Sequence, residues 1–336
     1  MKRKTLTTAV MAGLTGVAGM MSVANAVNVN PDGLGQVLLY PYYTARGGNN
    51  TLISVVNTTS SAKAVKIRFI EALNSREVLD FNIYMSGFDV WTAGVVDLEA
   101  VERGTGPGIV TSDTTCTAPY IFGDSDGDQE FVDFQFAVDP EDTTEGNDTN
   151  DGGPQGIERT ASGYIEIIEM GTLAADGLVE GWVTHSQETG VPDDCASVVD
   201  LWRTPADGAD TDGGGELGTW NENLPSGDSE FSFAEDGATG GIFGAASIIN
   251  VAEGTMFGYN ATAIDAFWPN GTTVHENPGN VLPNLASSDR LRSNVFVNGA
   301  VESIDWGNSI FAVNAAITFD QLMNEFNIEN NLGARS

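Results

Sequence analysis

Apolar and polar residues alternate with a period of two along several stretches of this chain. Residues 79–85 carry leucine, phenylalanine, isoleucine and methionine at every second position, and residues 65–69 and 132–138 alternate in the same way. This period is typical of a β-strand that has one face on a core and the other on solvent. Residues 241–264 read as a hairpin that turns at Glu253-Gly254. We therefore predict antiparallel strands over these stretches.

The segment from Thr51 to Ser86 contains three successive strand patterns, TLISVVNTT, AKAVKIRFIEAL and VLDFNIYMS, joined by short polar turns. The sequence shows no long amphipathic helix pattern. One short helix is predicted near the C-terminus, capped by Thr318 and with Gln321 at the capping-box position. We predict a mainly β fold: an antiparallel β-sandwich, immunoglobulin-like or jelly-roll-like, with long acidic loops and this one short C-terminal helix.

The N-terminus has the features of an export signal. Basic residues at positions 2–4 precede an apolar run, and residues 24–26 read Ala-Asn-Ala, the small-x-small form that signal peptidase cuts. The run is too short for the roughly 20 apolar residues of a membrane span. We therefore predict a signal peptide at 1–26 and one large domain at 27–336. The location is extracellular or on the cell surface, with the periplasm as the alternative.

Acidic residues far outnumber basic ones, with 47 Asp and Glu against 14 Lys and Arg and a formal net charge of −33. Such a charge argues against nucleic acid and anionic lipid as partners, because both require a basic surface. The acids gather near 101–130, 139–160 and 203–230, in segments too polar to form a core of their own. We predict solvated loops inserted between strands; loops that bind a cation or a partner are the alternative.

One acidic run has the spacing of a metal-binding loop. Asp124, Asp126, Asp128 and Glu130 occupy alternate positions of the run, and Gly127 allows a tight bend. Ca²⁺ prefers six to eight oxygen ligands, and alternate positions of a loop can converge on one ion. The run departs from the EF-hand pattern at its glycine and at its terminal glutamate. The sequence predicts weak Ca²⁺ binding here, with a solvated acidic turn as the alternative, and no cofactor is predicted to be required.

Two cysteines are present, Cys116 and Cys195. An even number of cysteines in an exported chain favours a disulfide. Both lie in acid- and threonine-rich sequence that reads as loop. A catalytic thiol would instead need a neighbouring base and a lowered pKa. We predict a Cys116–Cys195 disulfide.

Sequence motifs of catalysis are not found. There is no G-x-S-x-G elbow and no phosphate-binding loop, and neither His185 nor His275 has a second histidine or a cysteine at metal-ligand spacing. A Ser/His/Asp triad assembled in space around either histidine stays an alternative, as does a carboxylate pair of the glycosidase type. Trp220 lies in acidic, glycine-rich sequence and is the best candidate for an exposed aromatic ring that stacks on a sugar.

Two blocks of the chain resemble a known group of sequences. Residues 35–94, GQVLLYPYYT through DVWTAGV, look like the opening of a family of uncharacterised exported proteins of Gram-negative bacteria, described as hypothetical or cell-surface proteins. Residues 240–264, GGIFGAASIINVAEGTMFGYNATAI, are similar to a second block of that family. The resemblance implies a secreted, mainly β protein and carries over no catalytic residue.

These observations favour a secreted structural or adhesive protein of the Gram-negative cell surface that is not an enzyme. The alternatives are a carbohydrate- or calcium-binding module and a secreted hydrolase. The expected partners are further copies of the chain, other surface proteins or polysaccharide. We also expect the natural chain to continue beyond Ser336 with further strand sequence, so that residues 1–336 alone leave one sheet edge open.

Overall fold

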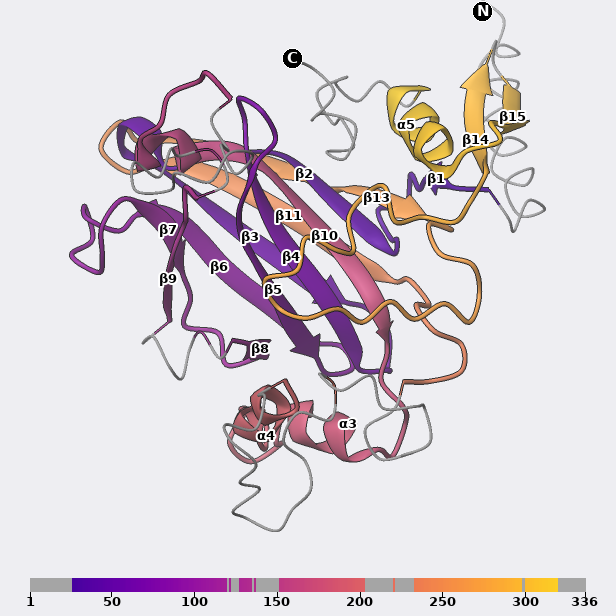
Figure 1. Ribbon diagram of the computed structural model, residues 1–336. Helices are drawn as coiled ribbons and strands as arrows, with labels where there is room; N and C mark the ends of the chain where they lie inside the picture. The colour runs from indigo at the N-terminus through magenta and orange to yellow at the C-terminus, as the bar shows by residue number, and fades with distance from the viewer. Residues whose placement is uncertain are drawn as a thin grey trace, which may run out of the picture.

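Most strands of the protein belong to two antiparallel sheets packed face to face, as Figure 1 shows for the computed structural model. The structure describes residues 26–119, 121, 127–134, 136, 151–202, 220, 233–297 and 300–319. The predicted mainly β, antiparallel sandwich is confirmed. The predicted signal peptide lies outside the described residues, except for Ala26.

The larger sheet has seven strands in the order β1-β13-β2-β10-β4-β5-β8, all antiparallel. Its strands are β1 (Asn28–Val29), β13 (Thr262–Asp265), β2 (Val37–Thr44), β10 (Ser162–Thr172), β4 (Lys63–Glu71), β5 (Glu77–Met85) and β8 (Cys116–Ala118). Short 3-10 turns, η2 (Arg46–Gly48) and η3 (Ile157–Ala161), follow β2 and precede β10. A separate two-stranded sheet pairs β14 (Arg292–Val297) with β15 (Ala300–Asp305).

The second sheet of the sandwich has six strands in the order β12-β11-β3-β6-β7-β9. Its strands are β12 (Thr255–Asn260), β11 (Ile242–Asn250), β3 (Asn49–Asn57), β6 (Val90–Asp97), β7 (Pro107–Val110) and β9 (Asp128–Glu130). The hairpin predicted over 241–264 is confirmed, because β11 and β12 pair directly through a turn that includes Glu253 and Gly254.

The core lies between the two sheets and uses the alternate positions that the sequence pattern identified. Val65, Ile67 and Phe69 of β4 are fully buried there, together with Phe81 of β5 and Trp91 of β6. Burying a side chain of this size stabilises a fold by about 1.5–3 kcal/mol. The apolar period of the sequence therefore places the two sheets against each other.

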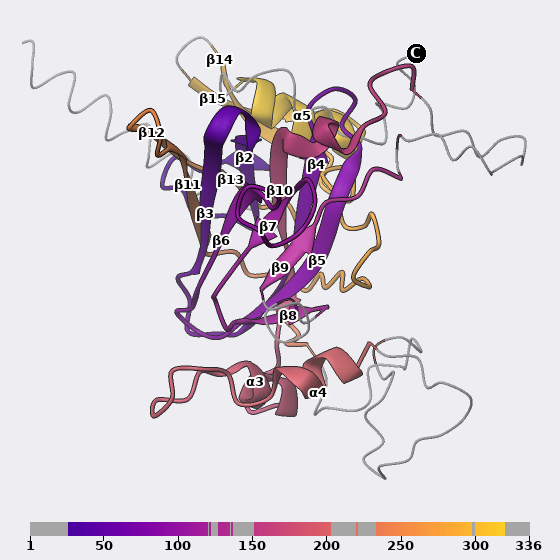
Figure 2. The ribbon, with the colours of Figure 1, turned by 90° about the vertical axis from the view of Figure 1, so that its left-hand side faces the viewer.

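The outer face of the seven-stranded sheet is also covered. The irregular segment 266–291 and helix α5 (Ser309–Phe319) pack on it, and an apolar cluster joins them to the sheet. Lys66, which alternates with the core residues of β4, pairs with Asp80 at 2.9 Å and donates to the Asn277 carbonyl at 2.8 Å. Figure 2 shows α3 (Leu178–Val183) and α4 (Cys195–Asp200) at one end of the sandwich and α5 at the other.

Several sequence predictions of local structure are wrong. Residues 132–134 and 136 form no strand; Val132 and Phe134 are exposed, and a turn there places Phe136 beneath Arg159. The segment 101–130 is not loop throughout, because it contains β7, β8 and β9.

The sequence pattern did not predict helix α5, and Thr318, predicted as the cap of a later helix, lies within it. Helix α5 ends at Phe319, near the predicted cap Thr318, whereas Gln321 and the residues after it lie outside the described part of the chain. The Asn308 side chain accepts from the Ile310 N–H at 2.9 Å. Asn308 therefore caps this helix.

Candidate functional site

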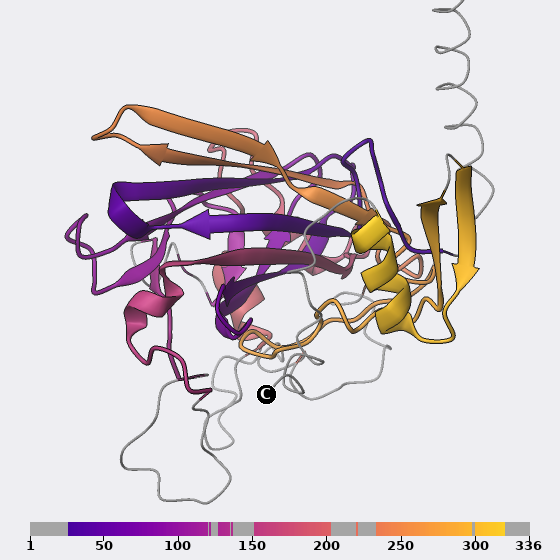
Figure 3. The same ribbon diagram turned by 90° about the horizontal axis from the view of Figure 1, so that it is seen from above.

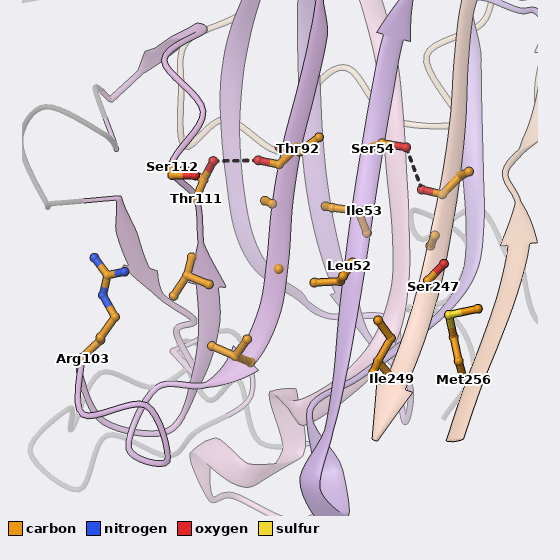
Figure 4. Close-up of a pocket in the computed structure, with 16 residues that line it drawn as sticks. Leu52, Ile53, Ser54, Thr92, Arg103, Thr111, Ser112, Ser247, Ile249 and Met256 are labelled. Carbon is orange, nitrogen blue, oxygen red and sulfur yellow. Dashed lines mark hydrogen bonds between the residues drawn. The ribbon is translucent and has the colours of Figure 1, made fainter. Parts of the chain in front are cut away.

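A groove crosses the outer face of the six-stranded sheet, where no described element packs. Figure 4 shows it as a shallow hollow over the neighbouring strands β7, β6, β3, β11 and β12. Its volume is about 600 Å³. Small and aliphatic side chains line most of it, chiefly Leu52, Gly94, Val96, Val110, Ala245, Ile249 and Met256, with the hydroxyl residues Ser54, Thr92 and Ser247.

The hollow follows from strand register. Leu52 of β3 stands opposite Gly94 on β6 and Ser247 on β11, so a large side chain has a small neighbour on each side. Ile249 stands opposite Met256 of β12, which is 72% exposed. Because successive residues of a strand point to opposite faces, these side chains face away from the core that their neighbours build.

Two of the hydroxyl groups of the groove donate hydrogen bonds within the sheet. The Thr111 hydroxyl donates to the Thr92 carbonyl at 2.6 Å, and the Ser54 hydroxyl donates to the Ala245 carbonyl at 3.3 Å (Figure 4). Among the described residues that line the groove, Arg103 alone carries a charge.

Arg103 lies at the rim of the groove, and its charge is paired. Its guanidinium pairs with Asp128 at 2.8 Å. In a chain with a net charge of −33, the described lining of the groove is largely aliphatic and carries one charge, that of Arg103. Such a surface binds by apolar contact and shape.

The residues predicted to hold Ca²⁺ are only partly described. Asp124 and Asp126 lie outside the described residues. Asp128 pairs with Arg103, and Glu130 accepts from the Thr105 N–H at 2.8 Å. In the described part of the chain, no group of three or more His, Cys, Asp or Glu side chains is arranged to hold a metal. Ca²⁺ binding at this run stays a prediction.

The predicted disulfide is confirmed, and it joins Cys116 to Cys195 with a Cα–Cα distance of 5.0 Å. Neither cysteine lies in a loop: Cys116 begins β8 and Cys195 begins α4. The Asp194 carboxylate caps α4 by accepting from the Ser197 N–H at 3.0 Å. The disulfide therefore ties the short helices α3 and α4 to an edge of the seven-stranded sheet.

The Trp220 ring belongs to an aromatic cluster rather than standing alone on the surface. It is partly buried, stacks on Tyr84 with ring centroids 5.4 Å apart, and lies 4.6 Å from the His275 ring. Trp202 and Phe233 complete the cluster. The role of Trp220 in sugar binding stays a prediction.

His275 is held neutral inside this cluster. Burial, and secondarily the charge of Lys66, lowers the pKa of His275 to about 3. Burial raises the pKa of Tyr84, whose hydroxyl lies 2.9 Å from His275 Nε2 and accepts from the Trp202 indole N–H at 2.7 Å. With the histidine neutral, the Tyr84 hydroxyl can donate to Nε2.

The second histidine has a serine and an aspartate beside it, but not in the order that a nucleophilic triad needs. Ser86 Oγ lies 3.0 Å from His185 Nδ1, and Asp89 Oδ2 lies 3.7 Å from the same nitrogen. A triad requires the serine and the carboxylate on different ring nitrogens. Asp89 also accepts from the Ser86 N–H at 3.2 Å, as in a hairpin turn. This arrangement does not activate Ser86 as a nucleophile.

Comparison of the chain with protein-family models, with curated proteins and with solved structures gave no match. The resemblance to exported proteins therefore stays an expectation. Among the described residues, no helix combines the length and the apolar character needed to cross a bilayer.

Sequence reasoning missed the groove, although a signal for it is present. In TLISVVNTT, the positions that alternate with the core residues Ile53 and Val55 are Leu52, Ser54 and Val56. A face exposed to solvent in an acidic protein would be expected to carry charged residues there. These alternate positions are uncharged in β3 and again in IFGAASIIN of β11, so the sequence already marks this face as less acidic than the rest of the chain.

Proposed function

We propose that the protein is a secreted, non-catalytic structural or adhesive protein of the Gram-negative cell surface. In this proposal, the outer face of the six-stranded sheet contacts an uncharged, aliphatic surface of another protein in the envelope. The single observation that carries the proposal is a largely aliphatic groove, whose described lining contains no acidic residue, in a chain with a net charge of −33.

The chemistry of the groove favours a protein surface over a polysaccharide. Its described lining contains no aromatic ring, and rings are the usual platforms for sugars. Leu52, Ile249 and Met256 resemble the inner face of a sandwich, which packs on a second apolar face about 10 Å away. The rim charge at Arg103 is neutralised by Asp128 and so adds no attraction for an anion.

The test is attachment of the protein to the cells that export it. Leu52→Asp places a carboxylate in the middle of the groove, and we expect the cell-bound fraction to fall about tenfold or more, the effect of losing a central apolar contact. Leu73→Asp is the matched control, since Leu73 is 62% exposed and does not line the groove. Both variants are compared with the wild type by fractionation and by surface protease accessibility.

Equal circular dichroism and melting temperature would show that Leu52→Asp folds, since the side chain it replaces is 47% exposed. If the folded Leu52→Asp protein stays on the cells as fully as Leu73→Asp, the groove is not the contact surface and the proposal fails.

A further inference from the structure

The four edges of the two large sheets are not equally protected. In the seven-stranded sheet, the edge strands are β1 with two residues and β8 with three. In the six-stranded sheet, one edge is β9, with three residues and the charged side chains Asp128 and Glu130. The other edge is β12, with six residues, TMFGYN, and no charge. Short or charged strands are the usual protection of an edge, and β12 has neither.

The side chains of β12 are unusually apolar for their exposure. Met256 is 72% exposed and Phe257 is 65% exposed. The strand contains no proline or lysine, and its register with β11 runs without a bulge from Thr255 to Asn260. Figure 3 shows this hairpin at the border of the sandwich. Pairing with another strand would place a neighbouring side chain beside each of them, on opposite faces of the sheet.

The direction of the backbone groups follows from one hydrogen bond. The Ala261 N–H donates to the Gly244 carbonyl at 2.9 Å. In an antiparallel ladder, hydrogen-bonded pairs recur at every second residue. Thr255, Phe257 and Tyr259 therefore bond to β11. The N–H and C=O groups of Met256, Gly258 and Asn260 point away from β11, to the side where no described strand lies.

We propose that β12 pairs antiparallel with β12 of a second copy of the chain, so that two six-stranded sheets become one continuous sheet. Placing Gly258 opposite its own mate lets Met256 bond to Asn260 of the second copy, and all outward groups are then satisfied. Phe257 then stands beside Tyr259 of the second copy and extends the pair of rings that are 6.1 Å apart within one chain.

The charge of the chain favours this edge over other contacts between copies. With a net charge of −33, two copies repel at most surfaces, and β12 joins them through a strand without carboxylates. Higher salt screens the remaining repulsion. We therefore expect the dimer fraction to rise with ionic strength, which is opposite to the behaviour of an association held by ion pairs.

The experiment is sedimentation velocity of the purified protein over a range of concentrations, with two variants at Gly258. Gly258→Pro removes the central outward N–H without touching the bonds to β11, and we expect a monomer at concentrations where the wild type has twice the mass. Gly258→Ala is the matched control, since an added Cβ would meet its nearest neighbour, Ser247 Oγ, at 3.4 Å. It should dimerise like the wild type.

Cross-linking tests the register. Gly258→Cys places two thiols about 5.5 Å apart by Cα, within disulfide reach, and should give a covalent dimer on oxidation. Thr255→Cys is equally exposed, but its mate lies about 20 Å away at about 3.4 Å per residue. It should stay monomeric on a non-reducing gel. A wild type that remains monomeric, a Gly258→Pro variant that still dimerises, or equal cross-linking at both positions would overturn the inference.

This inference deepens the proposed structural role, because it names a second copy as one partner of the protein. It uses the backbone groups of β12, a strand whose Met256 also lines the groove, and its readout is the mass of the purified protein. A wild type that stays monomeric, while Leu52→Asp loses its attachment to cells, would therefore refute the β12 pairing alone. A Leu52→Asp protein that stays on the cells, while the wild type dimerises, would refute the proposed function alone.

Discussion

Arg159 is fully buried and links three separate segments of the chain. Its Nε and Nη2 donate to the two carboxylate oxygens of Glu71, each at 2.9 Å, and Nη1 donates to Asp151 at 2.8 Å. The guanidinium also lies 4.2 Å from the centroid of the Phe136 ring. We expect Arg159→Met to destabilise the fold strongly, because methionine can fill part of the space but cannot neutralise Glu71.

The size of the loss in stability depends on the interactions that Glu71 keeps in Arg159→Met. Its carboxylate accepts from the backbone N–H groups of Leu73 and Asn74 at 2.7 and 2.9 Å, which hold it in the β4–β5 turn and away from water. Burial alone would raise the pKa of Glu71, but the Arg159 and backbone hydrogen bonds hold it below the ordinary value. Breaking a buried pair from one side costs about 3–5 kcal/mol.

Urea unfolding measures this loss. With a slope of about 3 kcal/mol per molar urea for a chain of this size, the midpoint of Arg159→Met should fall by about 1–2 M. Glu71→Gln added to Arg159→Met removes the stranded charge, so the double variant should be about 2 kcal/mol more stable than Arg159→Met alone. Arg103→Met is the control, because Arg103 is 40% exposed and its ion pair contributes less than about 1 kcal/mol.

Acid pH gives a second test of the same cause. A carboxyl whose folded pKa is lowered stabilises the fold above its unfolded pKa, and that contribution is lost as the pH falls through the folded value. The gap between wild type and Arg159→Met should therefore shrink below the ordinary Glu pKa of 4.5. A loss below about 1 kcal/mol at neutral pH, or a double variant no better than Arg159→Met, would refute the reasoning.

Three further predictions concern other parts of the fold. Replacing Cys116 and Cys195 by serine removes a disulfide between residues 79 apart, and the chain-entropy model gives a loss of about 4.5 kcal/mol in the free energy of unfolding. The urea midpoint should fall to that of the reduced wild type. His275 stays neutral in the folded protein, whereas in the unfolded chain it gains a proton below pH 6.5. The free energy of unfolding of the wild type should therefore fall by up to about 1.4 kcal/mol per pH unit between 6.5 and about 3, and His275→Gln should flatten this slope. Ca²⁺ at about 0.1–1 mM should raise the melting temperature of the wild type over EDTA, but not that of Asp126→Asn/Asp128→Asn; an equal response of the two proteins would place the ion elsewhere.

The sequence pattern was most informative where a strand meets the core on one side. Alternation over residues 51–85 predicted β3, β4 and β5 nearly to their ends, since Val65, Ile67 and Phe69 all enter the core. Short strands such as β8 escaped prediction because a few residues define no period. The partners of β8 on β5 lie more than thirty positions earlier, as in the pair of Asn82 with Ala118.

The helices were missed for a related reason. Helix α5, SIFAVNAAITF, is apolar on nearly every side and contains no charge, so no 3.6-residue period marks it. Its cap, Asn308, was visible in the sequence, but the hydrophobic run after it has no polar face to confirm a helix. The helices α3 and α4 have six residues each, shorter than a periodic signal requires.

The alternating pattern also gave a wrong prediction of exposure for one face of β4. Lys66 and Arg68 alternate with the core residues and read as solvent-facing, yet both are buried. Their charges are compensated by carboxylates on the neighbouring strands: Lys66 pairs with Asp80 of β5, and Arg68 pairs with Glu77 of β5 at 2.6 Å and with Glu166 of β10. The segment 266–291 then closes over them. Pairing of this kind is set by the tertiary fold, and a single-strand pattern cannot show it.

The burial of basic residues affects which charges the surface of this protein presents to a partner. Of the 14 lysines and arginines, Lys63, Lys66, Arg68 and Arg159 are buried beside carboxylates, so the accessible surface is poorer in positive charge than the composition implies. The chain therefore offers little positive charge to an acidic partner, such as a second copy of itself. In our proposals, contact through the groove or the β12 edge gains its free energy from apolar burial and backbone pairing. Pairing of two acidic copies through β12 should strengthen as salt screens their repulsion, whereas binding held by surface ion pairs would weaken.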